Sequence, residues 1–247
     1  MRLLITGSGE RQDALRKVCA SHGHTLPAHG PWDAAVLPLP RSSITEREAD
    51  WLPRGQAVIC GITDAAFDCL AARRGWRLIR VMEDKEYLLE NAALTAEGAV
   101  FAAMNARKDA LKDCRCLVVG FGRIGRALTE RLRSLGAETA VAARREESRR
   151  EAGENSVPMD GISRLLPNTD IVFNTVPENI FTAAQLSLMP RDGVYIELAS
   201  PPYGIGLEEI KQAKVQHLLE SGVPGRYCPL SAASALLRVI ERTVKST

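Results

Sequence analysis

The chain has 247 residues, which suits one large domain or two small ones. Its net charge of +2 gives no argument for a nucleic-acid partner, and no apolar run approaches the ~20 residues that a membrane span needs. The N-terminus lacks the pattern of a signal peptide, and the six cysteines lack the spacing of a zinc site. We therefore expect a cytoplasmic protein with reduced thiols and no metal.

Strand and helix patterns alternate through the first third of the chain. Short apolar runs predict strands over 3–6, 33–40, 57–61 and 76–81, and helical spacing predicts helices over 9–23 and 63–75. Thr45, which precedes Glu46 and Glu48, is expected to cap a short helix. Continuous apolar strands in this alternation predict a parallel sheet that is covered on both faces.

A long helical stretch over 83–110 separates this pattern from a second one. Beyond it, strands are expected over 114–119, 138–143, 170–177, 193–200 and 215–220, and helices over 122–136, 160–166 and 229–245. We predict an α/β fold with two domains that the long helix joins. Residues 1–90 form a smaller flavodoxin-like parallel-sheet domain, which the C-terminal helix 229–247 completes. Residues 91–228, with the linking helix, form a Rossmann dinucleotide-binding domain.

The stretch LVVGFGRIGRAL at 117–128 places a glycine motif between a predicted strand and a predicted helix. The first glycine permits the tight turn, the second lets a pyrophosphate approach the backbone, and the third lets helix and strand pack closely. The free N–H groups at the start of the helix favour an anion. The motif predicts dinucleotide binding by Gly120, Gly122, Arg123, Ile124 and Gly125. A glycine-rich turn that serves packing alone is the alternative.

Two arginines follow the next predicted strand. NAD-binding proteins usually place an acidic residue there, which accepts hydrogen bonds from the ribose 2′-hydroxyl. Arg144 and Arg145 instead suit a 2′-phosphate in charge and in geometry. We therefore predict NADP as the cofactor. Glu146 and Glu147 follow directly, so NAD stays open.

Three further segments end predicted strands at the edge of the sheet where ligands bind. We expect Asn174, Thr175, Val176 and Pro177 to line the cofactor site, and a plain strand-terminating turn is the alternative. The segment 197–200 should lie near the nicotinamide. The segment 221–225 is expected to form a rigid loop at the wall of the site.

The other polar motifs argue against further chemistry. The early turn at 7–9 is followed at once by Glu10, which is unfavourable for an anion, so we expect no nucleotide there. Three of the histidines are expected on the surface and the fourth is expected to be packed in a strand; these are His22, His24, His29 and His217. No histidine pairs clearly with a carboxylate as acid and base, which counts against a 2-hydroxyacid dehydrogenase.

Together these residues resemble the family of dipicolinate synthase A subunits over most of the chain. The more specific matches are Thr95-Ala-Glu97-Gly98 and Gly222-Val-Pro-Gly225. The other matches are GSGERQ at 7–12, VLP at 36–38, CGI at 60–62, NAAL at 91–94, VGFGRIG at 119–125, NTVP at 174–177 and ELAS at 197–200. The wider architecture is similar to the 2-hydroxyacid dehydrogenases, whose N-terminal domain also takes back the C-terminal helix.

The resemblance implies an NADP-dependent oxidoreductase that converts dihydrodipicolinate, or hydroxytetrahydrodipicolinate, to dipicolinate. It places the protein in the mother cell of a sporulating bacterium, where its partner is the flavoprotein-like B subunit of dipicolinate synthase and its substrate is a small dicarboxylate. Neither nucleic acid nor a membrane is expected as a partner, and a homo-oligomer is left open. Two alternatives stay open: another NADP-dependent dehydrogenase of hydroxyacid or shikimate type, and a non-catalytic NADP-binding partner subunit.

The resemblance also suggests which residues meet the substrate. Glu97, a charged residue on the linking helix, is the candidate for acid–base chemistry or substrate contact. The alternative is a structural helix residue that caps a backbone group or pairs with an arginine. The candidates for substrate binding are Asn91, Ser200, Gly222 and Arg226.

At two positions the chain departs from the family pattern. Pro201 and Leu230 stand where the resemblance leads us to expect an arginine and a lysine. A dicarboxylate needs such cations as partners. Arg226 and Lys85 are the residues that remain for this role.

Overall fold

The structure is a computed structural model that describes residues 1–40 and 42–244. The chain divides into two compact units. Unit 1 contains Met1–Asn91 and the segment from Pro224 onward, and unit 2 contains Ala92–Val223. The sequence placed the second boundary after residue 228, whereas the structure assigns residues 224–228 to unit 1. Within the described ranges, the helices are too short or too polar to cross a membrane.

A parallel sheet with the strand order β1-β2-β3-β4 forms the centre of unit 1. The strands are β1 (Leu3–Ile5), β2 (Ala34–Val36), β3 (Ala57–Cys60) and β4 (Arg77–Arg80). An isolated parallel bridge joins Arg2 to Thr25, and Leu3 N donates to Thr25 O on the edge of β1 that faces away from β2. With this bridge as a rudimentary strand, the order becomes the 2-1-3-4-5 order of flavodoxin-like sheets, so the predicted fold class is confirmed.

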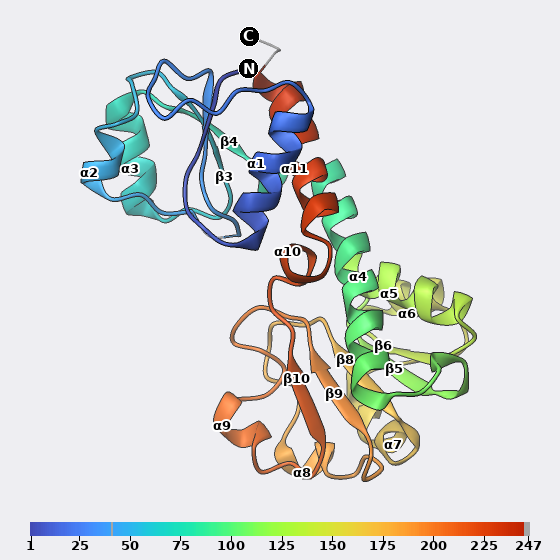
Figure 1. The fold of residues 1–247 in the computed structure, drawn as a ribbon. Helices are drawn as coiled ribbons and strands as arrows, with labels where there is room; N and C mark the ends of the chain where they lie inside the picture. The colour runs from blue at the N-terminus through green and yellow to red at the C-terminus, as the bar shows by residue number, and fades with distance from the viewer. Residues whose placement is uncertain (41, 245–247) are drawn as a thin grey trace. The chain divides into compact units, whose positions relative to one another are not determined.

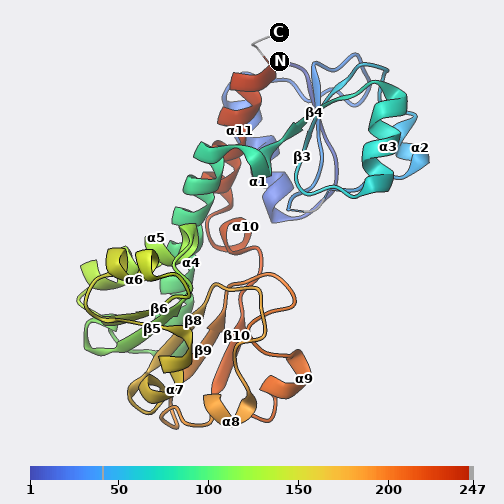
Figure 2. The same ribbon diagram turned by 180° about the vertical axis from the view of Figure 1, so that it is seen from behind.

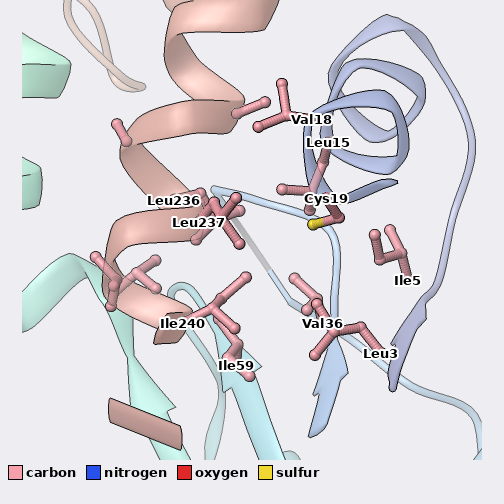
Figure 3. Close-up of a cluster of buried hydrophobic side chains, with 14 of the residues drawn as sticks. Leu3, Ile5, Leu15, Val18, Cys19, Val36, Ile59, Leu236, Leu237 and Ile240 are labelled. Carbon is pink, nitrogen blue, oxygen red and sulfur yellow. The ribbon is translucent and has the colours of Figure 1, made fainter. Parts of the chain in front are cut away.

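Two pairs of helices cover the two faces of this sheet. Helices α1 (Glu10–Ser21) and α11 (Pro229–Val244) lie on one face, and α2 (Glu46–Ala49) and α3 (Ala65–Arg74) lie on the other (Figures 1 and 2). Figure 3 shows the first of these cores, in which side chains of α1 and α11 meet alternate strand residues; it contains Leu3, Ile5, Leu15, Val18, Cys19, Val36, Ile59, Leu236, Leu237 and Ile240. The C-terminal helix therefore completes the core of unit 1.

Unit 2 is built on a six-stranded parallel sheet with the order β10-β9-β8-β5-β6-β7. The strands are β5 (Arg115–Val119), β6 (Glu138–Ala142), β7 (Ser156–Val157), β8 (Ile171–Asn174), β9 (Val194–Glu197) and β10 (Gln216–Leu219). This is the doubly wound order of a Rossmann sheet, whose topological switch point lies between the first and fourth strands, here β5 and β8. The Rossmann prediction is confirmed, although the two-residue strand β7 was not predicted.

The helices of unit 2 connect these strands. Helix α4 (Lys85–Arg107) begins in unit 1 and carries a buried alanine-rich face in unit 2. The others are α5 (Arg123–Ser134), α6 (Glu146–Ala152), α7 (Ile162–Leu165), α8 (Ala183–Leu186) and α9 (Leu207–Ile210). Short 3-10 turns occur at Val81–Glu83, Leu111–Asp113, Met159–Gly161 and Leu166–Asn168.

Three local predictions are wrong. The segment 221–225 is not all loop, because helix α10 (Val223–Tyr227) begins within it, and Pro224 is tolerated in a first turn, where its missing N–H is not needed. His24 is buried, because its Nε2 lies 3.0 Å from a carboxylate oxygen of Glu241 on α11. His217 is exposed, because β10 is an edge strand.

Candidate dinucleotide-binding site

A cavity of about 550 Å³ opens in unit 2 where strands β5, β6 and β8 end. Ligands of open α/β sheets bind outside the carboxyl ends of the strands at the switch point, and this cavity occupies that place. Most of the residues predicted to hold the cofactor line it: Gly120, Gly122, Arg123, Ile124, Arg144, Arg145, Thr175, Val176 and Pro177. The sequence did not single out five further lining residues, which are Phe121, Ala143, Ser148, Met159 and Glu178.

The three glycines of the motif meet three different steric conditions. Gly120 has a φ of +94°, and a Cβ there would lie 2.4 Å from Thr175 Oγ1. A Cβ on Gly125 would lie 2.1 Å from the carbonyl oxygen of Gly120. At Gly122 no heavy atom of the described chain would come within 4 Å of an added Cβ. Protein contacts thus require two of the glycines, while the third leaves open space beside the backbone for a ligand.

Helix α5 presents free donors to this space. It begins at Arg123 after Gly122, with no acidic residue in its first turn, and within residues 1–40 and 42–244 no side chain caps its N-terminus. The first N–H groups of a helix lack intrahelical partners, and the helix dipole makes this end favourable for an anion. The turn therefore suits the pyrophosphate of a dinucleotide.

Asn174 shapes one wall of the cavity from behind. Its side chain is fully buried and does not line the cavity. Its Nδ2 donates to Val176 O at 2.9 Å, and its Oδ1 accepts from Val176 N at 3.1 Å. The residue was predicted to line the site, whereas the structure gives it the role of holding the backbone of 174–176, and Thr175 adds a bond from Oγ1 to Val119 O at 2.9 Å.

A buried carboxylate holds the ends of β8 and β9 together. Glu197 is 4% exposed, and its Oε1 accepts from Asn174 Nδ2 at 2.8 Å and from Ala199 N at 3.0 Å. Its Oε2 accepts from Tyr195 OH at 2.6 Å and from Gly204 N at 2.7 Å. Burial, and then the charge of Glu197, raise the pKa of Tyr195 far above its ordinary value. The sequence placed this segment near the nicotinamide without recognising Glu197 as an anchor; the alternation of Tyr195 and Glu197 on one face of the strand was the available signal.

The two arginines at the end of β6 differ in their surroundings. Arg144 forms an ion pair with Glu178 across the cavity lining. Arg145 has no ion-pair or hydrogen-bond partner among the residues that the structure describes. Arg149 donates to Ala143 O at 2.9 Å and to Arg144 O at 2.7 Å, which fixes the turn between β6 and α6. The site thus keeps one guanidinium unpaired beside the cavity.

The candidate catalytic residue lies outside this lining. Glu97 is exposed on α4, and its Oε1 accepts from Arg131 of α5 at 3.1 Å. This ion pair matches the structural alternative, and a catalytic role for Glu97 stays a prediction. In the described part of the chain, no group of three or more His, Cys, Asp or Glu side chains is arranged to hold a metal ion.

The candidate substrate residues divide between the two units. Asn91 on α4 and Arg226 on α10 belong to unit 1, where the Arg226 guanidinium lies 5.1 Å from the Tyr227 ring centre. Ser200 and Gly222 belong to unit 2, and both are exposed. Their roles in binding stay predictions.

A known domain family matches the segment that carries the cavity. Residues 85–201 match the NAD binding domain of the D-isomer specific 2-hydroxyacid dehydrogenases. This match supports a nicotinamide dinucleotide as the cofactor and an oxidoreductase-type role.

Relatives of known name match the chain over most of its length. The dipicolinate synthase A subunit of Bacillus subtilis (strain 168) is 26% identical over 196 residues, which are 78% of this chain and 66% of that protein. The crystal structure of the Bacillus halodurans A subunit superposes with a TM-score of 0.84 at 22% identity and covers 98% of this chain and 97% of that one. The Bacillus subtilis A chain superposes with a TM-score of 0.81 at 20% identity and covers 100% and 96%.

Proposed function

Because the chain is similar to the A subunit of dipicolinate synthase in sequence and in fold, we propose that it is an NADP-dependent oxidoreductase of dipicolinate synthesis. Its substrate would be dihydrodipicolinate, or hydroxytetrahydrodipicolinate, which first loses water to give the same compound. Conversion of dihydrodipicolinate to dipicolinate removes one hydride and one proton and creates an aromatic ring. When bound, NADP⁺ supplies the acceptor for that hydride.

The observation that carries the proposal is the cavity at the glycine turn. It combines the open space at Gly122, the uncapped start of α5 and the unpaired guanidinium of Arg145. The first two features suit a pyrophosphate, and the third suits a second phosphate at the end of β6. NADP carries phosphate groups at both places, whereas NAD carries only the pyrophosphate.

The chain's own residues would bind the substrate and take up its proton. Arg226 and Lys85 are the proposed partners of the two carboxylates, since Pro201 and Leu230 supply no charge. Asn91, Ser200 and Gly222 are proposed to contact the substrate. Glu97 is proposed as the acid–base residue, and it would have to exchange its bond with Arg131 for one with the substrate.

The proposed partner is the flavoprotein-like B subunit of dipicolinate synthase, in the mother cell of a sporulating bacterium. The curated relative is named as one lettered subunit of its enzyme, and this name supports the existence of a second subunit. The neutral side chains Pro201 and Leu230 favour a second candidate function, in which this chain binds NADP and orders its partner without catalysing the oxidation.

One experiment separates these functions. The chain is purified with and without the B subunit, supplied with dihydrodipicolinate and NADP⁺, and followed by the absorbance of dipicolinate. Formation of dipicolinate by the chain alone supports the proposal. Tight binding of NADP⁺ without turnover, whether or not the B subunit is present, supports the non-catalytic role. Turnover of a hydroxyacid or of shikimate instead of dihydrodipicolinate identifies a different NADP-dependent dehydrogenase.

A further inference from the structure

Ser148 places a buried hydroxyl at the cavity without a partner. It lies in α6, is 6% exposed and lines the cavity, and in the described structure its hydroxyl makes no hydrogen bond. By contrast, the buried hydroxyls of Thr129, Thr139 and Thr169 in the same unit each donate to a backbone carbonyl oxygen. Buried polar groups are normally paired, so the hydroxyl of Ser148 points to a ligand in the cavity.

Arg145 stands next to this hydroxyl. It occupies the N-cap position of α6, and Ser148 is the third residue of that helix, so the two side chains project towards the same place, as they do in a capping box. Both line the cavity. The acids that follow Arg145 do not neutralise it: Glu146 pairs with Arg150, and Glu147 is exposed. A guanidinium and a hydroxyl that converge are donors for the oxygens of a phosphate monoester.

Arg144 contributes differently, because Glu178 already neutralises it. The pair is exposed, with 70% of the Arg144 side chain and 58% of the Glu178 side chain accessible. An exposed pair of this kind is weak, so its removal costs little. The carboxylate of Glu178, however, puts a negative charge on the lining of the cavity, and that charge opposes a phosphate dianion there.

We propose that Arg145 and Ser148 hold the 2′-phosphate of the dinucleotide, and that Glu178 weakens the preference for that phosphate by its charge and by its hold on Arg144. This inference rests on the proposed function, since it assumes that the cavity takes NADP. It divides the basic pair into one residue that binds and one that is restrained. It also adds two residues to the specificity site, one favourable and one unfavourable.

The test compares the dissociation constants of NADPH and NADH by titration of their fluorescence. Ser148→Ala and Arg145→Gln should each weaken NADPH about tenfold, as expected for the loss of a charge-assisted bond, and should change NADH less than about twofold. Glu178→Gln should tighten NADPH about threefold to tenfold and leave NADH nearly unchanged.

Matched controls come from the same helix and the strand after it. Ser156→Ala removes a hydroxyl that donates to Arg149 O outside the cavity lining, and Arg150→Gln removes a guanidinium that pairs with Glu146. Both should keep the wild-type ratio of the two constants. If Ser148→Ala and Arg145→Gln also keep that ratio while the wild type binds NADPH, the inference is overturned and the proposed function stands. If the wild type binds neither dinucleotide, the proposed function and the inference both fail.

Discussion

Replacement of Glu197 by glutamine is the sharpest test of how the wall of the cavity is held. In the wild type, each carboxylate oxygen accepts from two donors. Glutamine keeps one oxygen and puts an NH₂ group in place of the other. If the NH₂ group takes the place of Oε1, it faces Asn174 Nδ2 and Ala199 N, and Asn174 cannot turn over because its Oδ1 already accepts from Val176 N.

The other orientation is the less costly one. With the NH₂ group in the place of Oε2, the hydroxyl of Tyr195 can rotate and accept, but the N–H of Gly204 is left facing another N–H. One buried donor without a partner costs about 1–3 kcal/mol. For a chain of this length each kcal/mol lowers the melting temperature by about 2–4 °C, so we expect a fall of about 2–12 °C.

Calorimetry is the assay for this change. The three tryptophans Trp32, Trp51 and Trp76 all lie in unit 1, so tryptophan fluorescence does not report on unit 2 directly. Glu130→Gln is the matched control, since Glu130 is exposed on α5 and its carboxylate makes no hydrogen bond or ion pair within the described ranges. A melting temperature of Glu197→Gln within about 1 °C of that of the control would refute the reasoning.

Three further predictions follow from single contacts. Gly125→Ala forces a Cβ against Gly120 O, so it should destabilise by about 1–3 kcal/mol and weaken NADPH binding, whereas Gly206→Ala, whose nearest contact would be 3.8 Å, should stay within about 1 kcal/mol of the wild type; calorimetry and NADPH titration measure both. Glu97→Gln breaks a half-exposed ion pair and should cost less than about 1 kcal/mol, while turnover of dihydrodipicolinate should fall by a factor of about 10²–10⁴ with NADPH binding unchanged; unchanged turnover would leave Glu97 a structural residue. Burial raises the pKa of Cys19 and Cys60 to about 11 and that of Cys116 to about 12, so above pH 9 these thiols ionise first in the unfolded chain, which then binds fewer protons, and the free energy of unfolding should fall; urea unfolding that is flat between about pH 8 and pH 10 contradicts this.

The sequence predicted those features that depend on neighbours in the chain. The glycine turn was predictable because the strand, the turn and the helix are contiguous. The fold class followed from the alternation of strands and helices. The rudimentary strand at Thr25 and the two-residue strand β7 were missed, because segments this short carry no periodicity.

The features that were missed join residues far apart in sequence. Glu197 meets Asn174 only because β8 and β9 are neighbours in the sheet, and His24 meets Glu241 only because α11 returns to unit 1. The role of Asn174 was misjudged for the same reason, since the sequence did not show that Glu197 and Val176 occupy its polar atoms. The contrast between Arg144 and Arg145 depends on Glu178, which reaches the cavity from another strand end.

The two sides of the cavity are built by different kinds of interaction. The glycine turn and the wall at 174–176 rest on steric contacts and buried hydrogen bonds, in which most single changes leave an overlap or an unpaired buried group. The end of β6 rests on exposed charges and one hydroxyl, in which a single change alters affinity at little cost in stability. Binding of a dinucleotide is therefore a property of the fold, while the choice between NADP and NAD is adjustable at Arg145, Ser148 and Glu178. A variant at these three positions should accordingly change the ratio of the two affinities without a comparable change in melting temperature, whereas a variant at Gly125 or Glu197 should change the melting temperature as well.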